Sequence, residues 1–154
     1  MYKEITVLFV CSGNTCRSVM AQGIFAKLWE ESGRSELLNV SSAGTDTIDG
    51  LSATEEALDV LRREGADLMG HRSRKATGRL IEEANYIFTM TRQQRDALRQ
   101  LYPASAERIW LLHEYAFPGN ESDVSDPFGQ GGRQYQLTAG DIKAAILKVV
   151  EKIT

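Results

Sequence analysis

The stretch that decides the fold is ITVLFVCSGNTCRS, residues 5–18. Its first part, residues 5–10, is a continuous apolar run, which is typical of a strand buried on both faces in a parallel sheet. Gly13 and Asn14 tolerate the left-handed backbone conformations that a sharp loop needs. Residues 18–31 then carry apolar side chains at helical spacing. The stretch therefore predicts a buried strand that passes through a short loop into a helix.

Further along the chain, short apolar runs alternate with segments of helical pattern. The apolar runs predict strands at residues 37–40, 86–90 and 109–112. The helical patterns predict helices at residues 52–63, from 91 or 92 to 101, and at 138–153, the first of them starting with the capping-box pair Ser52 and Glu55. The polar, glycine-rich segment 119–134 is expected to be a long loop, and long loops in compact domains are often functional.

This alternation of strands and helices favours parallel pairing through right-handed crossovers. We therefore expect an α/β fold, a small flavodoxin-like three-layer sandwich in which a four-stranded parallel sheet has helices on both faces. The length of 154 residues fits a single domain over residues 1–154. Ligands of such sheets bind beyond the carboxyl ends of the strands. The loop after the first strand lies there.

Composition and charge narrow the class of protein. Hydrophobic residues make up 42% and charged residues 25%, as in ordinary globular proteins. The net charge of −3 argues against a broad basic surface for nucleic acid. The first apolar run is too short to span a membrane, and the two cysteines, Cys11 and Cys16, are too few for the disulfide framework of a secreted domain. We predict a cytoplasmic monomer that binds neither nucleic acid nor membrane.

The loop from Cys11 to Ser18 has the residue types of an anion cradle. Its backbone N–H groups can turn inward as a nest, and the following helix directs its positive end into the same space. Arg17, six positions after Cys11, can fold its guanidinium over the loop as a planar fork for two phosphate oxygens. The residues expected to surround the bound phosphate are Ser12, Gly13, Asn14, Thr15, Cys16 and Ser18.

Cys11 is the candidate nucleophile, because a positive cradle favours the reactive thiolate. It would attack a bound phosphate in line, while the amides and Arg17 hold the equatorial oxygens through the transition state. Ser18 could donate a hydrogen bond to the sulfur and ease its departure. A free cysteine is more often just a small buried hydrophobe, but the Gly-Asn pair and the trailing serine favour catalysis.

Other site types fit the residues less well. No Gly-Lys-Ser/Thr sequence follows the strand, as a nucleotide-binding loop requires. Two cysteines and two distant histidines lack the ligand spacing of a zinc site. The chemistry expected at Cys11 needs no metal and no organic cofactor.

The leaving group needs a proton, and Asp126 is the candidate donor. It begins the sequence Asp126-Pro127-Phe128-Gly129 within the expected long loop, which could bring its carboxyl group over the cradle. It would protonate the departing group and then deprotonate the hydrolytic water. Taken alone, an Asp-Pro pair is more typical of a turn.

Together these residues resemble the low-molecular-weight protein tyrosine phosphatase family over essentially the whole chain. The resemblance rests on residues 7–18, 42–44, 71–73 and 126–128. It implies one phosphatase domain whose substrates are phosphorylated proteins. It also implies roles for individual residues: Cys11 as nucleophile, Arg17 as phosphate clamp, Asp126 as acid and base, Phe128 beside the substrate, and Asn14, Ser18, Ser42 and His71 as support for the loop.

Within the family, the chain is most similar to the bacterial protein-arginine-phosphatases. Thr15 stands where tyrosine-specific members usually carry Ile, and Phe128 is followed by Gly129 instead of a second aromatic residue. Residues 45–49 contain no aromatic side chain to sandwich a phenyl ring. The carboxylate of Asp126 can accept the N–H groups of a planar guanidino group in a paired fork. We expect phosphoarginine in proteins as the substrate, with phosphotyrosine as the alternative.

Two further functions remain open, and some residues depart from the family pattern. An arsenate reductase would pass electrons through cysteines that follow Cys16, and the chain has none. A non-catalytic phosphate-binding module would not need the nucleophile, the clamp and the acid together.

Val19 replaces the usual Pro, Gln22 a common Glu, and Ser12 the Thr frequent in arginine-specific members. Cys16 matches a family position and could form a disulfide with Cys11 on oxidation.

Overall fold

The apolar run near the start of the chain forms strand β1 (Glu4–Cys11) in the interior of a four-stranded sheet. The computed structural model describes residues 3–153. Its sheet has the order β2-β1-β3-β4, with β2 at Leu37–Gly44, β3 at Tyr86–Thr89 and β4 at Ile109–Leu111. All three pairings are parallel. The predicted α/β fold with a four-stranded parallel sheet is confirmed.

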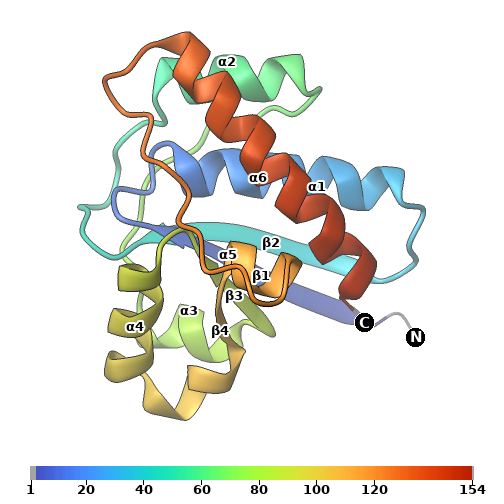
Figure 1. Ribbon diagram of the computed structural model, residues 1–154, viewed down its shortest axis with the longest axis vertical. Helices are drawn as coiled ribbons and strands as arrows, with labels where there is room; N and C mark the ends of the chain where they lie inside the picture. Colours follow the sequence, from blue (N-terminus) through green and yellow to red (C-terminus); the bar gives the residue numbers. More distant parts are fainter. Residues whose placement is uncertain (1–2, 154) are drawn as a thin grey trace.

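Helices cover both faces of the sheet (Figure 1). One face is covered by α1 (Arg17–Glu31), α2 (Glu55–Arg63), α5 (Leu112–Ala116) and α6 (Gly132–Lys152). The other face is covered by α3 (Gly78–Glu83) and α4 (Arg92–Leu101), and a 3-10 turn, η1 (Pro103–Arg108), leads into β4. The flavodoxin-like three-layer arrangement therefore follows from the alternation read in the sequence.

Strand β1 is apolar and buried from Val7 to Cys11 because this part of it faces two hydrophobic cores. Val7 and Phe9 pack in the core beneath α1 and α6, whereas Leu8 and Val10 pack in the core beneath α3 and α4. All four side chains are buried. Full burial of each such side chain stabilises the fold by about 1.5–3 kcal/mol, so β1 fixes the position of the loop that follows it.

The ends of two helices differ from the sequence-based expectation. Helix α2 begins at Glu55, and the hydroxyl of Thr54 caps it by accepting the Ala57 N–H at 3.2 Å. The predicted capping box at Ser52 is therefore wrong, and Ser52 forms an isolated β-bridge with Arg72 instead. Helix α6 begins at Gly132, before the expected start at residue 138, because buried Tyr135 anchors its first turn.

Other differences concern short or polar elements. Strand β2 runs on to Gly44 because its small polar residues pair with β1 as far as Cys11. Helices α3 and α5 were not expected, since six and five residues are too few to show helical periodicity. No helix within residues 3–153 is long and apolar enough to cross a membrane.

Candidate active site

The loop of residues 11–18 lies at the carboxyl end of β1, where several loops meet (Figure 1). The segment after β2 contacts it through backbone hydrogen bonds, from Thr45 N–H to Cys11 O at 2.9 Å and from Asp46 N–H to Ser12 O at 3.0 Å. The segment between α5 and α6 brings Asp126 to the same place. The structure thus gathers residues from distant parts of the chain around the predicted cradle.

The sulfur of Cys11 is buried and surrounded by hydrogen-bond donors. The backbone N–H of Asn14 donates to Sγ at 3.3 Å, and Ser18 Oγ lies 3.0 Å from Sγ. Ser18 Oγ also accepts a hydrogen bond from Asn14 Nδ2 at 2.9 Å. A thiol at Cys11 would donate to Ser18 Oγ, whereas a thiolate has no proton to give and would accept the Ser18 hydroxyl hydrogen. This arrangement suits a thiolate.

Asn14 holds the loop from several sides. Its backbone has a φ of 56°, and among residues 3–153 no other non-glycine residue has a positive φ. Its Oδ1 accepts the Arg74 N–H at 3.0 Å, and its carbonyl oxygen lies 2.8 Å from Nε2 of His71. The asparagine therefore joins the loop to the segment before α3.

His71 is a neutral donor in this arrangement. Burial lowers the pKa of its imidazole, and the nearby cations Arg74 and Arg72 lower it further, against the hydrogen bond to Asn14, which raises it. A neutral ring bonded to a carbonyl must carry its proton on Nε2. The expected support of the loop by His71 thus takes the form of an Nε2–H bond to Asn14 O.

Gly44 leaves room for the loop at the end of β2. A Cβ atom there would lie 2.7 Å from both the Ser12 carbonyl oxygen and Thr47 Cγ2. The backbone can approach this closely only at glycine, so the loop and the end of β2 fit together without a gap.

Ser42 supports the site indirectly. Its hydroxyl donates to Gln22 Oε1 at 2.7 Å, and its carbonyl oxygen accepts from Arg74 Nε at 3.1 Å. These bonds hold helix α1 and Arg74 instead of the loop itself. The bond from the Ser42 hydroxyl also satisfies the amide oxygen of Gln22, a residue that departs from the family pattern.

Arg17 is buried and fixed by the segment that carries the candidate acid. Its Nη1 donates to Val124 O at 3.0 Å, and its Nη2 lies 3.7 Å from Asp126 Oδ2. Its Nε is buried and has no hydrogen-bond partner among the residues that the structure describes. A buried guanidinium N–H without a protein partner is available to donate a hydrogen bond to a ligand.

Asp126 remains accessible while its position is fixed. Its side chain is 55% exposed. Its Oδ1 accepts the Phe128 N–H at 3.1 Å, and its carbonyl oxygen accepts from Gln130 Nε2 at 2.8 Å. The carboxyl group can therefore meet a leaving group at the mouth of the loop.

Cys16 has a different environment from Cys11. Burial raises the pKa of its thiol to about 12, with further contributions from Cys11 and Asp126. Its Sγ lies 3.8 Å from Asp126 Oδ1, to which the thiol can donate. Both cysteines are free in the structure. Cys16 is thus a protonated thiol next to the candidate acid.

A cleft of about 520 Å³ opens beside the loop. Thr15 and Phe128, the two residues expected to influence the choice of substrate, both line it, and Phe128 is 67% exposed. The remaining lining residues include Asp46, Thr47 and Ile48 from the segment after β2. Phe128 is the one aromatic side chain among the residues that line this cleft.

Gln94 was not predicted from the sequence to contact the loop. Its Nε2 donates to Ser12 Oγ at 3.0 Å, and its Oε1 accepts the N–H groups of Met90 and Thr91 at 3.0 Å. It thereby links the start of α4 to the loop. A local pattern could have drawn attention to Gln94, because Thr91 followed three residues later by Gln94 is a capping-box sequence. The structure contains that capping box.

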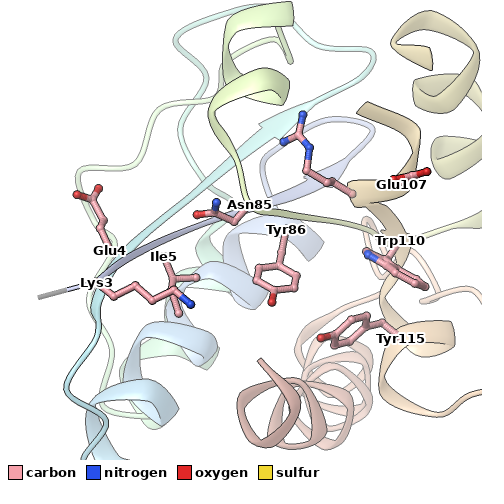
Figure 2. Close-up of a pocket in the computed structure, with 9 residues that line it drawn as sticks. Lys3, Glu4, Ile5, Asn85, Tyr86, Glu107, Trp110 and Tyr115 are labelled. Carbon is pink, nitrogen blue, oxygen red and sulfur yellow. The ribbon is translucent and has the colours of Figure 1, made fainter. Parts of the chain in front are cut away.

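A second cavity, of about 490 Å³, lies at the amino ends of β1, β3 and β4 (Figure 2). The rings of Tyr86, Trp110 and Tyr115 gather on one side of it, and Lys3 and Glu4 lie on another. None of the candidate site residues lines it. It opens at the other end of the strands from Cys11, whereas the first cleft is lined by Gly13 and Thr15 of the loop that begins at Cys11.

Comparison with known proteins shows which family the chain is similar to. The family model described as low molecular weight phosphotyrosine protein phosphatase matches residues 6–154. A protein-arginine-phosphatase of Bacillus subtilis is 31% identical over 147 residues, which cover 96% of this chain and 95% of that protein.

Solved structures with the same fold include phosphatases of both specificities. A low molecular weight protein tyrosine phosphatase from T. tengcongensis is 35% identical, with a TM-score of 0.90 over 97% of this chain and 99% of that one. The arginine phosphatase YwlE, in a cysteine-to-serine mutant with a phosphorylated active-site serine, is 30% identical, with a TM-score of 0.89 over 96% of this chain and 95% of that one. The chain belongs to the low molecular weight phosphotyrosine protein phosphatase family.

Proposed function

We propose that the protein removes phosphate from phosphoarginine residues of proteins through a phosphocysteine intermediate on Cys11. The observation that carries the proposal is the pairing of two features in one loop. The sulfur of Cys11 accepts the Asn14 N–H and lies 3.0 Å from the Ser18 hydroxyl oxygen, and the buried Arg17 Nε has no hydrogen-bond partner within residues 3–153. A nucleophile and an oxyanion donor thus lie at the two ends of the same short loop.

In the first step, the Cys11 thiolate attacks the phosphorus in line. A sulfur–phosphorus bond forms while the phosphorus–nitrogen bond of phosphoarginine breaks. The leaving nitrogen keeps the electron pair and takes the proton of Asp126. The loop amides and Arg17 hold the equatorial oxygens, so that charge developing on them meets preorganised donors.

In the second step, Asp126 acts as a base. Its carboxylate takes a proton from a water molecule, whose oxygen bonds to phosphorus as the sulfur–phosphorus bond breaks. The sulfur leaves as a thiolate and regains the hydrogen bond from Ser18. Inorganic phosphate is released, and Asp126 is protonated again for the next cycle.

The choice of phosphoarginine rests on the cleft beside the loop. Thr15 is smaller than the Ile usual in tyrosine-specific members, and the segment after β2 offers Thr47 and Ile48 where a phenyl ring would favour an aromatic partner. One methylene in a pocket is worth about 1–3 kcal/mol, so Thr15 biases specificity without making it absolute. The similarity to a protein-arginine-phosphatase supports the same choice. The alternative substrate is phosphotyrosine, which the tyrosine phosphatase from T. tengcongensis supports.

The test compares kcat/KM for phosphoarginine and phosphotyrosine in peptides of the same sequence. We expect the phosphoarginine peptide to have the higher kcat/KM. Thr15→Ile should shift the ratio of the two kcat/KM values toward phosphotyrosine by about tenfold or more, since the ethyl group of isoleucine is larger than the hydroxyl of threonine and would crowd the phosphoryl nitrogen. Cys11→Ser, which should abolish turnover, is the control for contaminating phosphatases. A preference of the unmodified protein for phosphotyrosine would remove the substrate proposal.

We also propose that the protein works as a cytoplasmic monomer on phosphorylated proteins. Sedimentation of the purified chain at micromolar concentration tests the monomer. A stable dimer would contradict it.

A further inference from the structure

The segment that carries Asp126 is attached to the start of helix α4. Asp123 Oδ1 accepts the backbone N–H of Arg92 at 2.9 Å and its Nε at 3.3 Å. Two residues earlier, Glu121 forms an ion pair with Arg95 at 3.3 Å. Arg95 is itself buried, and it also pairs with Glu114 of α5 at 3.1 Å. The residues just before Asp126 are therefore held by two arginines of one helix.

Val124, the residue after Asp123, connects the bonds to helix α4 with Arg17, the proposed phosphate clamp. Its side chain is buried, its N–H donates to Met90 O at 2.8 Å, and its carbonyl oxygen accepts from Arg17 Nη1 at 3.0 Å. The residue that binds Arg92 is thus followed directly by the residue whose carbonyl oxygen binds Arg17. Asp126 follows two residues later, with Oδ2 at 3.7 Å from Arg17 Nη2.

Asp123 is ionised at neutral pH in this setting. Burial by itself would raise the pKa of its carboxyl group, but the hydrogen bonds from the backbone and side chain of Arg92 outweigh burial and leave the pKa lowered. Arg92 is the first residue of α4, so the carboxylate also lies at the positive end of the helix.

We propose that Asp123, through its bonds to Arg92, is a positioning residue that sets where the carboxyl group of Asp126 meets the leaving group. The inference rests on the proposed function, in which Asp126 is the general acid. Displacement of a catalytic group by 1 Å can cost about a hundredfold in rate. The bonds of Asp123 fix the chain three residues before Asp126. The bonds from Phe128 and Gln130 fix it just after Asp126.

The test is Asp123→Asn with aryl phosphates whose leaving groups differ in basicity. The ratio kcat/KM reports only the transfer of phosphate to Cys11. Phenyl phosphate needs the proton of Asp126, and its kcat/KM should fall about tenfold when that group is misplaced. The value for para-nitrophenyl phosphate, a good leaving group, should fall less than about threefold. Inhibition by inorganic phosphate, which reports the loop and Arg17, should be unchanged, because the buried Val124 side chain and its bond to Met90 O still hold the carbonyl that Arg17 contacts.

A double mutant separates positioning from general damage. When Asp126→Asn is already present, adding Asp123→Asn should cause no further loss of kcat/KM for phenyl phosphate, because the two residues act through one group. Arg92→Gln should reproduce the leaving-group dependence of Asp123→Asn. Glu83→Gln is the matched control, since it breaks the exposed Arg79–Glu83 ion pair of α3, which is not bonded to the Asp126 segment.

The outcomes distinguish this inference from the proposed function. If Asp126→Asn slows phenyl and para-nitrophenyl phosphate equally, then Asp126 is not the acid, and its proposed role in the mechanism falls together with the positioning role of Asp123. If Asp126→Asn shows the dependence and Asp123→Asn does not, only the positioning role falls. Losses that add in the double mutant, or weaker inhibition by phosphate in Asp123→Asn, would also overturn it.

Discussion

Asn14 offers the sharpest test of how the loop is held, because its side chain and its backbone make separable contributions. The side chain makes two hydrogen bonds, from Nδ2 to Ser18 Oγ at 2.9 Å and from the Arg74 N–H to Oδ1 at 3.0 Å. The backbone has a φ of 56°, which asparagine tolerates better than alanine does. Asn14 is fully buried, so water cannot replace these bonds.

The magnitudes follow from these contacts. Two intramolecular hydrogen bonds contribute about 0.5–1.5 kcal/mol each, which gives roughly 1–3 kcal/mol for Asn14→Gly. Alanine loses the same bonds and in addition pays about 1–2 kcal/mol for the left-handed conformation. We therefore expect Asn14→Ala to lower the free energy of unfolding by about 2–5 kcal/mol. Asn14→Gly should recover about 1 kcal/mol of that loss.

Urea unfolding of the three proteins, followed by tryptophan fluorescence, measures the differences. Both variants should also lose kcat/KM with para-nitrophenyl phosphate, because Ser18 loses the Nδ2–H that orients its hydroxyl toward Cys11. Equal stability of the Ala and Gly variants would refute the argument from backbone conformation. Full activity of either variant would refute the argument that Asn14 orients Ser18.

Three further predictions test other parts of the site. Gly44→Ala places a Cβ at 2.7 Å from Ser12 O, so thermal unfolding should show a loss of about 1–3 kcal/mol together with lower kcat/KM; an unchanged melting temperature would show that the loop can move aside. Because burial lowers the pKa of His71 below the unfolded value, the unfolded chain binds the extra proton first, and stability should fall as pH drops below about 6.5. His71→Gln, compared by urea unfolding between pH 7 and pH 5 (about the range of histidine titration), should show a weaker fall. The thiol of Cys16, with a pKa of about 12, should resist iodoacetamide at neutral pH while Cys11 reacts, as peptide mass spectrometry would reveal; alkylation of Cys16 first would contradict this assignment.

The parts of the site that could be predicted from sequence are those made by residues close together in the chain. The nucleophile, the clamp and the left-handed Asn14 all lie between Cys11 and Ser18, so their order along the chain fixes their geometry. The sheet was equally predictable, because β1 is apolar on both faces and the strands alternate with helices. Asp126 was identified by its resemblance to a family pattern, since an Asp-Pro pair alone indicates only a turn.

The remaining features depend on pairs that the fold brings together. Gln94 reaches Ser12, and Arg92 reaches Asp123, across separations that no local pattern encodes. The cap of α2 shows the same limit on a smaller scale, because Ser52 and Thr54 are both acceptable caps by residue type. The β-bridge between Ser52 and Arg72 leaves Thr54 to cap the helix.

The proposed nucleophile is one of two cysteines in a single loop, and the two have different surroundings. Both are buried, so burial does not distinguish them. The difference lies in their partners. Around Cys11 are groups that can donate hydrogen bonds, the Asn14 N–H and the Ser18 hydroxyl. Next to Cys16 is the carboxyl group of Asp126, which accepts a hydrogen bond and opposes a second negative charge. Burial does most to raise the pKa of the Cys16 thiol, the neighbouring Cys11 adds to it, and the Asp126 carboxyl group contributes less. The proposed acid is therefore one of three causes that keep the Cys16 thiol from competing with Cys11.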